Sequence, residues 1–89
     1  MTVRRHYYIS GSVQGVGFRY RAYHAACGLG LTGFVKNLYD GRVEMEIQGE
    51  QELIPRMLAE IDSGHFIYIE DMDVSQIPVV EDERDFVVG

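Results

Sequence analysis

The chain has 89 residues, of which 46% are hydrophobic and 25% are charged, and its formal net charge is −6. This length suits one domain with a small core, so we expect residues 1–89 to form a single domain. No apolar run is long enough to span a bilayer, and the N-terminus lacks the apolar stretch of a signal peptide, which argues against a membrane partner. The acidic balance argues against nucleic acid as the main partner, because binding a phosphate backbone requires a broad basic surface.

The charges are divided unevenly along the chain. Residues 1–42 contain six basic residues and one acidic residue, whereas residues 43–89 contain two basic and thirteen acidic residues. Two interpretations stay open. The halves of a small domain interleave, so the asymmetry can be without spatial meaning, or the first half builds a locally positive anion site.

The first half of the chain predicts a strand, a helix and a hairpin. Residues 3–10 are rich in β-forming side chains that alternate, which is typical of a strand. Apolar residues then recur at helical spacing up to the sequence GLG, which ends the predicted helix. The apolar face of this helix consists of Phe18, Ala22, Ala25, Ala26 and Leu29. The runs 31–38 and 42–48 predict two strands, and Asp40-Gly41 between them favours a tight hairpin.

The second half predicts a helix and one or two strands. The pattern of residues 51–63 predicts an amphipathic helix with Pro55 in its first turn. The run HFIYIEDMDV predicts a strand whose alternation shifts between Ile69 and Met72, as at a β-bulge. The sequence EDERD predicts a solvated loop, and DFVVG a short fifth strand. The order β-α-β-β-α-β indicates an α+β, ferredoxin-like sandwich with two helices on one face of an antiparallel sheet.

The loop GSVQGVG, between the first strand and the first helix, allows two interpretations. Its glycines can form a tight turn, or they can let successive N–H groups surround an anion at the helix N-terminus. The spacing matches neither a Walker A loop nor G-x-G-x-x-G. Arg19 follows in the first helical turn, where its planar guanidinium can bind two oxygens of a phosphate. Asn37, before the hairpin, is either a turn residue or an amide that holds a water.

Other catalytic groups are not expected. The three histidines and Cys27 have no metal-ligand spacing with one another, so we predict no metal site. Cys27 lies among Ala25, Ala26 and Leu29, and we expect a packed residue rather than a nucleophile. A single cysteine cannot form an internal disulfide, which favours a reducing compartment such as the cytoplasm.

Two segments resemble a known family. The sequences GSVQGVGFR at 11–19 and GLTGFVKNLYDGRVEMEIQG at 30–49 closely resemble the acylphosphatases, whose signatures are G-x-V-Q-G-V-x-F-R and G-x-V-x-N-x-x-D-G-x-V-E. Both signatures are complete here. The resemblance implies a ferredoxin-like fold and hydrolysis of acyl phosphates to carboxylate and inorganic phosphate, without metal or cofactor. It further implies a monomer with a small-molecule substrate. At its C-terminal end the chain has FVVG where the family usually carries a basic residue, which leaves open whether this segment contacts the site.

The resemblance also assigns roles to residues. Arg19 would bind the phosphoryl oxygens, and the side chain of Asn37 would orient the attacking water. The backbone groups that would surround the phosphate belong to Gln14, Gly15, Val16, Gly17 and Phe18. Two alternatives remain. One is a non-catalytic anion-binding or regulatory domain of the same shape, and the other is the module at the front of large carbamoyl-phosphate-using maturation proteins, which is disfavoured because no cysteine clusters follow.

Overall fold

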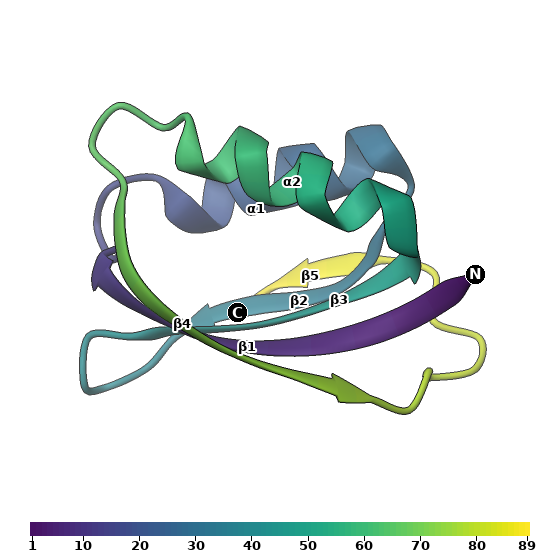
Figure 1. Ribbon diagram of the computed structural model, residues 1–89. Helices are drawn as coiled ribbons and strands as arrows, with labels where there is room; N and C mark the ends of the chain where they lie inside the picture. The colour runs from purple at the N-terminus through teal and green to yellow at the C-terminus, as the bar shows by residue number, and fades with distance from the viewer.

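A computed structural model describes all 89 residues and contains five strands and two α-helices (Figure 1). The elements in chain order are β1 (Thr2–Ser12), α1 (Phe18–Leu29), β2 (Thr32–Asn37), β3 (Val43–Glu50), a 3₁₀ turn (Gln51–Leu53), α2 (Ile54–Asp62), β4 (Tyr68–Ile77) and β5 (Phe86–Val88). Neither helix is long and apolar enough to cross a membrane.

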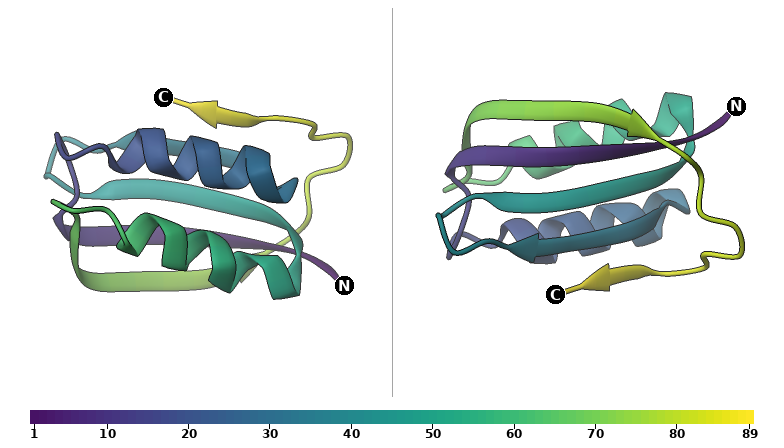
Figure 2. Two further views of the ribbon diagram at one scale, coloured as in Figure 1. Left: turned by 90° about the horizontal axis from the view of Figure 1, so that it is seen from above. Right: turned by 90° about the horizontal axis from the view of Figure 1, so that it is seen from below.

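The strands form one sheet in the order β4-β1-β3-β2-β5, and both helices cover the same face (Figures 1 and 2). Strands β1 to β4 pair antiparallel with one another, whereas β5 pairs parallel to β2. The ferredoxin-like prediction is therefore confirmed, together with its fifth strand. The parallel pairing of β5 makes the sheet mixed rather than purely antiparallel.

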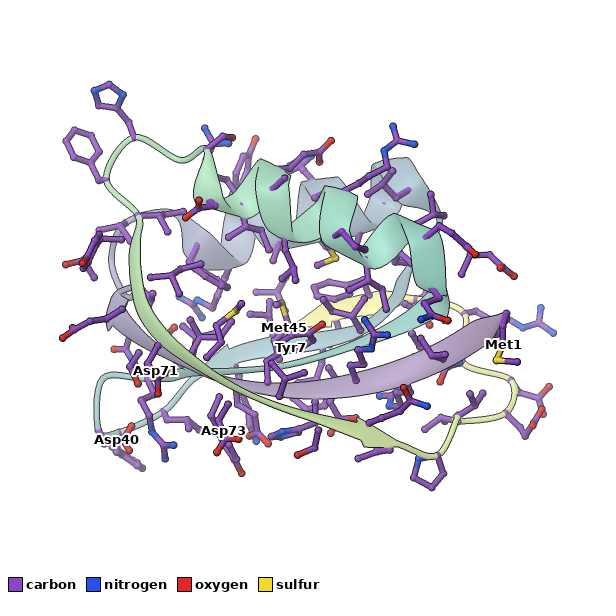
Figure 3. The ribbon with its side chains drawn as sticks, in the orientation of Figure 1. Met1, Tyr7, Asp40, Met45, Asp71 and Asp73 are labelled. Carbon is purple, nitrogen blue, oxygen red and sulfur yellow. The ribbon has the colours of Figure 1, made fainter.

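The core lies between the helices and the covered face of the sheet. Alternation along β1 and β3 directs one set of side chains inward, as the sequence pattern predicted. Tyr7 and Met45, which are neighbours across the two strands, are almost completely buried under the helices (Figure 3). Asp71 and Asp73 of β4 lie on the opposite, open face, because they pair with residues of the other parity in β1.

The two predicted irregularities are present. The amide of Leu38 donates to the carbonyl of Arg42 (2.8 Å), and Gly41 adopts a φ of 93°, which glycine tolerates without strain in a tight hairpin. In β4, Ile69 pairs with Gly11 and Asp71 with Ser10, so Glu70 is the additional residue of a β-bulge.

One predicted loop is not simply solvated. Residues 78–85 connect β4 to β5 across one end of the sheet (Figure 2). Glu83 in this segment bonds to Arg4 on the open face (2.7 Å), and the backbone of Val80 makes two hydrogen bonds with the Gln48 side chain. Arg4 is consequently only 3% exposed, although strand alternation places it on the uncovered face. The prediction of a fully solvated EDERD loop was wrong for Glu83.

The prediction for Cys27 was also wrong. Ala25 and Ala26 are buried in α1, but Cys27 is exposed. Each residue turns the helix by about 100°, because an α-helix has 3.6 residues per turn, so the residue after two buried ones reaches the solvent face.

Candidate active site

The loop between β1 and α1 is anchored by its apolar side chains. Val13 and Phe18 are each 1% exposed, and Val16 packs against the same core. Between these anchors Gly15 and Gly17 have φ values of 71° and 85°, in the left-handed region that non-glycine residues rarely adopt. The loop is thus held from beneath, and its outer side consists of backbone.

That backbone is rich in free donors. No main-chain N–H from Gln14 to Tyr20 donates a hydrogen bond within the protein, and the first to do so is that of Arg21, to the carbonyl of Gly17 (3.0 Å). Unpaired N–H groups at a helix N-terminus favour an anion, both as donors and through the helix dipole. The loop therefore has the properties of an anion cradle rather than only of a tight turn.

Asn37 lies in the same pocket as this loop. A cavity of about 150 Å³ is lined by Gly15, Gly17, Arg19, Asn37 and neighbouring residues. Liquid water takes about 30 Å³ per molecule, so this space can hold a phosphate-sized group and a water. The carbonyl oxygen Oδ1 of Asn37 is buried and receives no hydrogen bond from the protein. Since buried polar atoms are nearly always bonded, this oxygen is an acceptor for which the protein itself supplies no donor.

Gln14 has a side-chain role that sequence reasoning missed. Its amide Nε2 donates to the carbonyls of Leu38 (2.7 Å) and Arg42 (2.9 Å), the two residues that close the β2–β3 hairpin. This pair of hydrogen bonds fixes the loop relative to the hairpin, and thereby relative to Asn37. The only property of the sequence consistent with these two hydrogen bonds was the length of the glutamine side chain.

Arg19 is held from the far end of the chain. Its Nη1 donates to the carbonyl oxygen of Gly89 (2.6 Å), and the amide of Gly89 donates to the carbonyl of Val35 (2.8 Å). The C-terminal segment therefore contacts the site, which the sequence had left open. No local pattern could have shown this contact, because it depends on β5 pairing with β2.

Two of the six basic side chains of the first half are neutralised across the sheet. Arg4 pairs with Glu46 and Glu83, and Lys36 pairs with Glu44. Arg19 is in no ion pair with an aspartate or glutamate side chain. Interleaving thus cancels part of the asymmetry, and the positive charge in the lining of the cradle comes from Arg19.

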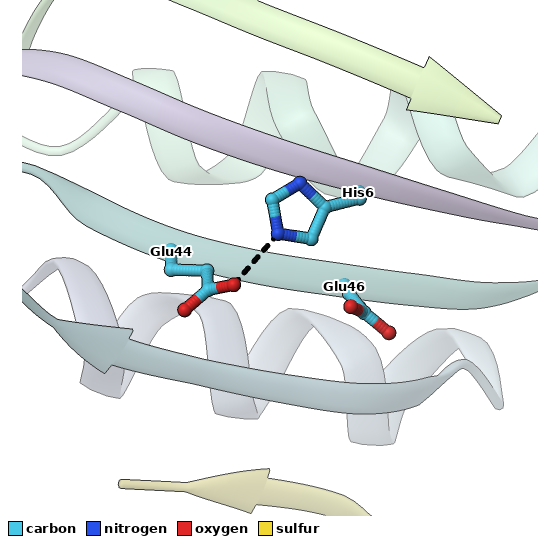
Figure 4. Close-up of side chains that lie close together, drawn as sticks. All are labelled: His6, Glu44 and Glu46. Atoms are coloured by element: carbon cyan, nitrogen blue, oxygen red, sulfur yellow. Dashed lines mark hydrogen bonds and ion pairs between the residues drawn. The ribbon is translucent and has the colours of Figure 1, made fainter. Parts of the chain in front are cut away.

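Three potential metal ligands meet on the open face of the sheet. The ligand atoms of His6, Glu44 and Glu46 lie within 4.8 Å of one another, and His6 Nε2 bonds to Glu44 (2.7 Å; Figure 4). This hydrogen bond lowers the pKa of Glu44 below its ordinary value. Sequence spacing did not indicate this group of potential ligands, because it forms across paired strands. Its three members do not line the cradle, and Arg4 and Lys36 already neutralise the two carboxylates.

Comparisons with known proteins agree with this geometry. The sequence model of the acylphosphatase family matches residues 5–88. An acylphosphatase of Clostridium beijerinckii is 42% identical over 81 residues, covering 90% of each chain. The crystal structure of acylphosphatase from Bacillus subtilis matches with a TM-score of 0.88 at 31% identity, covering 100% of this chain and 99% of that one. An acylphosphatase structure from Coxiella burnetii gives a TM-score of 0.85 at 37% identity, covering 99% and 93%. With the two loop signatures assembled in one pocket, this chain belongs to the acylphosphatase family.

Proposed function

We propose that this protein hydrolyses acyl phosphates to a carboxylate and inorganic phosphate, without a metal ion. The backbone N–H groups of Gln14 to Phe18 and the guanidinium of Arg19 bind the phosphoryl oxygens, and Asn37 orients the attacking water. The relatives named above support the substrate class. The free donors and the position of Arg19 beside them support the roles of the residues.

The arrangement suits a reaction that needs mainly electrostatic help. A carboxylate is a good leaving group, so the site has only to neutralise the phosphoryl charge and align a water in line with the breaking P–O bond. Preorganised N–H donors and the Arg19 fork meet this requirement where charge accumulates in the transition state. The hydrogen bond to the main-chain oxygen of Gly89 orients the Arg19 fork.

The pocket offers neither a general base nor metal ligands. Its lining contains no histidine, cysteine or carboxylate side chain. The water's proton therefore passes to an oxygen of the phosphoryl group itself, and the carboxylate departs unprotonated. Besides the groups that bind the phosphoryl oxygens, chemistry of this kind needs a residue that holds the water but no proton acceptor from the protein.

Asn37 is the observation that carries the proposal. Its buried, unbonded Oδ1 can accept a hydrogen from the water, an arrangement for which a purely anion-binding domain has no use. This favours the enzyme over the non-catalytic alternative.

The test is an assay of acetyl phosphate and benzoyl phosphate hydrolysis in EDTA, with inorganic phosphate as competitor. We expect Asn37→Ala to lower kcat by about 10²-fold or more, the cost of one preorganised group, while inhibition by phosphate persists. Tyr39→Ala, an exposed change on the same hairpin, is the control and is expected to behave as wild type. Full turnover by Asn37→Ala, or no turnover by the unaltered protein, would refute the proposal.

A further inference from the structure

A second, larger pocket adjoins the cradle. It has a volume of about 500 Å³ and lies between α1 and the C-terminal end of α2. Gly17 and Tyr20 line both this pocket and the cradle, so the two spaces are adjacent. We refer to the larger space as the interhelical groove.

Hydrogen bonds between the helices fix the far side of this groove. Arg21 Nη1 donates to the carbonyl of Glu60 (3.2 Å) and to the hydroxyl of Ser63 (3.3 Å). The Ser63 hydroxyl in turn donates to the same Glu60 carbonyl (2.7 Å). These bonds tie the first turns of α1 to the last turn of α2, so the width of the groove is set by the fold.

The near side of the groove is aromatic. The ring of Tyr20 lies against the ring of His24, with 4.3 Å between centroids, although Tyr20 is 68% exposed. The ring of His24 also makes an edge contact with the ring of Tyr23, with 5.4 Å between centroids. An exposed ring held in place by a neighbour is a flat surface on which a planar group can stack at little entropic cost.

The reaction geometry requires the acyl group to leave the cradle on the side away from the water. Attacking and leaving oxygens lie roughly in line at the phosphorus, so the acyl group departs on the side away from the water. Asn37 lines the cradle but not the interhelical groove. The groove shares Gly17 and Tyr20 with the cradle, whereas Asn37, the residue proposed to hold the water, is not part of its lining.

On this basis, and resting on the proposed function, we propose that the interhelical groove binds the acyl group of the substrate and that Tyr20 sets its specificity. The favoured substrates are acyl phosphates whose acyl group is planar and aromatic or conjugated, because such a group stacks on the Tyr20 ring. A small acyl group such as acetyl leaves the groove empty and gains nothing from it.

The experiment compares kcat/KM for benzoyl phosphate with kcat/KM for acetyl phosphate. A general effect of a variant on the cradle cancels in this ratio, and the difference between the two leaving groups cancels when the ratio of a variant is compared with that of the unaltered protein. We expect Tyr20→Ala to lower the ratio by about three- to tenfold, which corresponds to one aromatic contact. Tyr20→Phe keeps the ring and is expected to keep the ratio. Tyr39→Ala, an exposed aromatic residue that lines neither the groove nor the cradle, is the control.

A binding measurement separates the groove from the chemistry. We expect phenylphosphonate to inhibit the unaltered protein more strongly than methylphosphonate, and Tyr20→Ala to remove this preference. An unchanged substrate ratio and an unchanged inhibitor preference in Tyr20→Ala would overturn the groove assignment while leaving the proposed function intact. Failure of the unaltered protein to hydrolyse either substrate would instead overturn the proposed function.

Discussion

Two arginines of this molecule, Arg4 and Arg19, lie in contrasting surroundings. Arg4, on the open face of the sheet, is 3% exposed and bonds to Glu46 (2.7 Å), Glu83 (2.7 Å) and Gln48 (3.0 Å). Arg19, in the cradle, is exposed and makes one hydrogen bond, to the carbonyl of Gly89.

The difference separates a structural cation from one available to a ligand. The guanidinium of Arg4 is neutralised by carboxylates, and its removal would leave those acids half-buried without a counter-charge. No aspartate or glutamate side chain pairs with Arg19, and it has several free N–H donors beside backbone donors that are also free. We therefore expect changes at Arg4 to affect stability and changes at Arg19 to affect activity.

The largest expected effect concerns Arg19. Arg19→Ala should lower kcat/KM for acetyl phosphate by about 10²–10³-fold, the usual cost of one preorganised donor. Arg19→Lys should also lose most activity, because a point charge cannot bind two oxygens as the fork does. The melting temperature should stay close to that of the unaltered protein, since exposed residues contribute little to stability. Normal turnover by Arg19→Ala would contradict the expectation that Arg19, unlike Arg4, acts in activity.

The second effect concerns Arg4. Arg4→Met keeps the apolar volume but removes the cation between two acids. The free energy of unfolding should fall by about 2–3 kcal/mol, somewhat less than for a completely buried pair, because both carboxylates retain some contact with solvent.

A matched control for this change is Arg42→Met, whose pair with Asp40 is exposed and should contribute much less to stability than the pairs of Arg4. Urea denaturation measures both variants. Equal losses in the two would contradict the structural role of Arg4, and a loss of activity per folded Arg4→Met molecule would contradict its separation from the site.

A smaller effect is expected at the cradle backbone. A Cβ on Gly17 meets no atom within 4 Å, so Gly17→Ala adds only the strain of a φ of 85°. This should cost about 1–2 kcal/mol in the free energy of unfolding. Relaxation of the strain would move the N–H groups of the cradle, so inhibition by phosphate should weaken as well. Unchanged phosphate affinity would show that these N–H groups do not bind the anion.

The smallest effect is a pH dependence of stability. Burial alone would raise the pKa of Glu83, but the hydrogen bond from Arg4 and other favourable contacts lower it, net, below its ordinary 4.5. The folded state thus binds fewer protons than the unfolded state. The stabilisation is present above about pH 4.5 and is lost as the pH falls through the folded pKa. Urea midpoints at pH 6 and pH 3.5 should differ less in Glu83→Gln than in the unaltered protein, and an equal difference would contradict this linkage.

The elements themselves were predictable because their signals are local. Alternation in β1 and β3, helical spacing in α1, and Asp40-Gly41 at the hairpin each act within a few residues. The β-bulge was also visible, as a shift in the alternation of β4. The neighbours of Arg4 and the exposure of Cys27 were not predicted, because both depend on which face the surrounding segments cover.

For the site, the sequence by itself determined which residues carry the chemistry. Glycines that permit a left-handed loop, an arginine at the start of a helix and an asparagine before a hairpin are properties of short segments. Only the tertiary structure decided how these segments meet. The Gln14 side chain joins loop to hairpin, the Gly89 carbonyl orients Arg19 across 70 residues, and the packing of α1 on α2 opens a groove beside the cradle. The physical reason is that such contacts join residues distant in sequence, and their geometry exists only once the sheet has paired and the helices have packed on it.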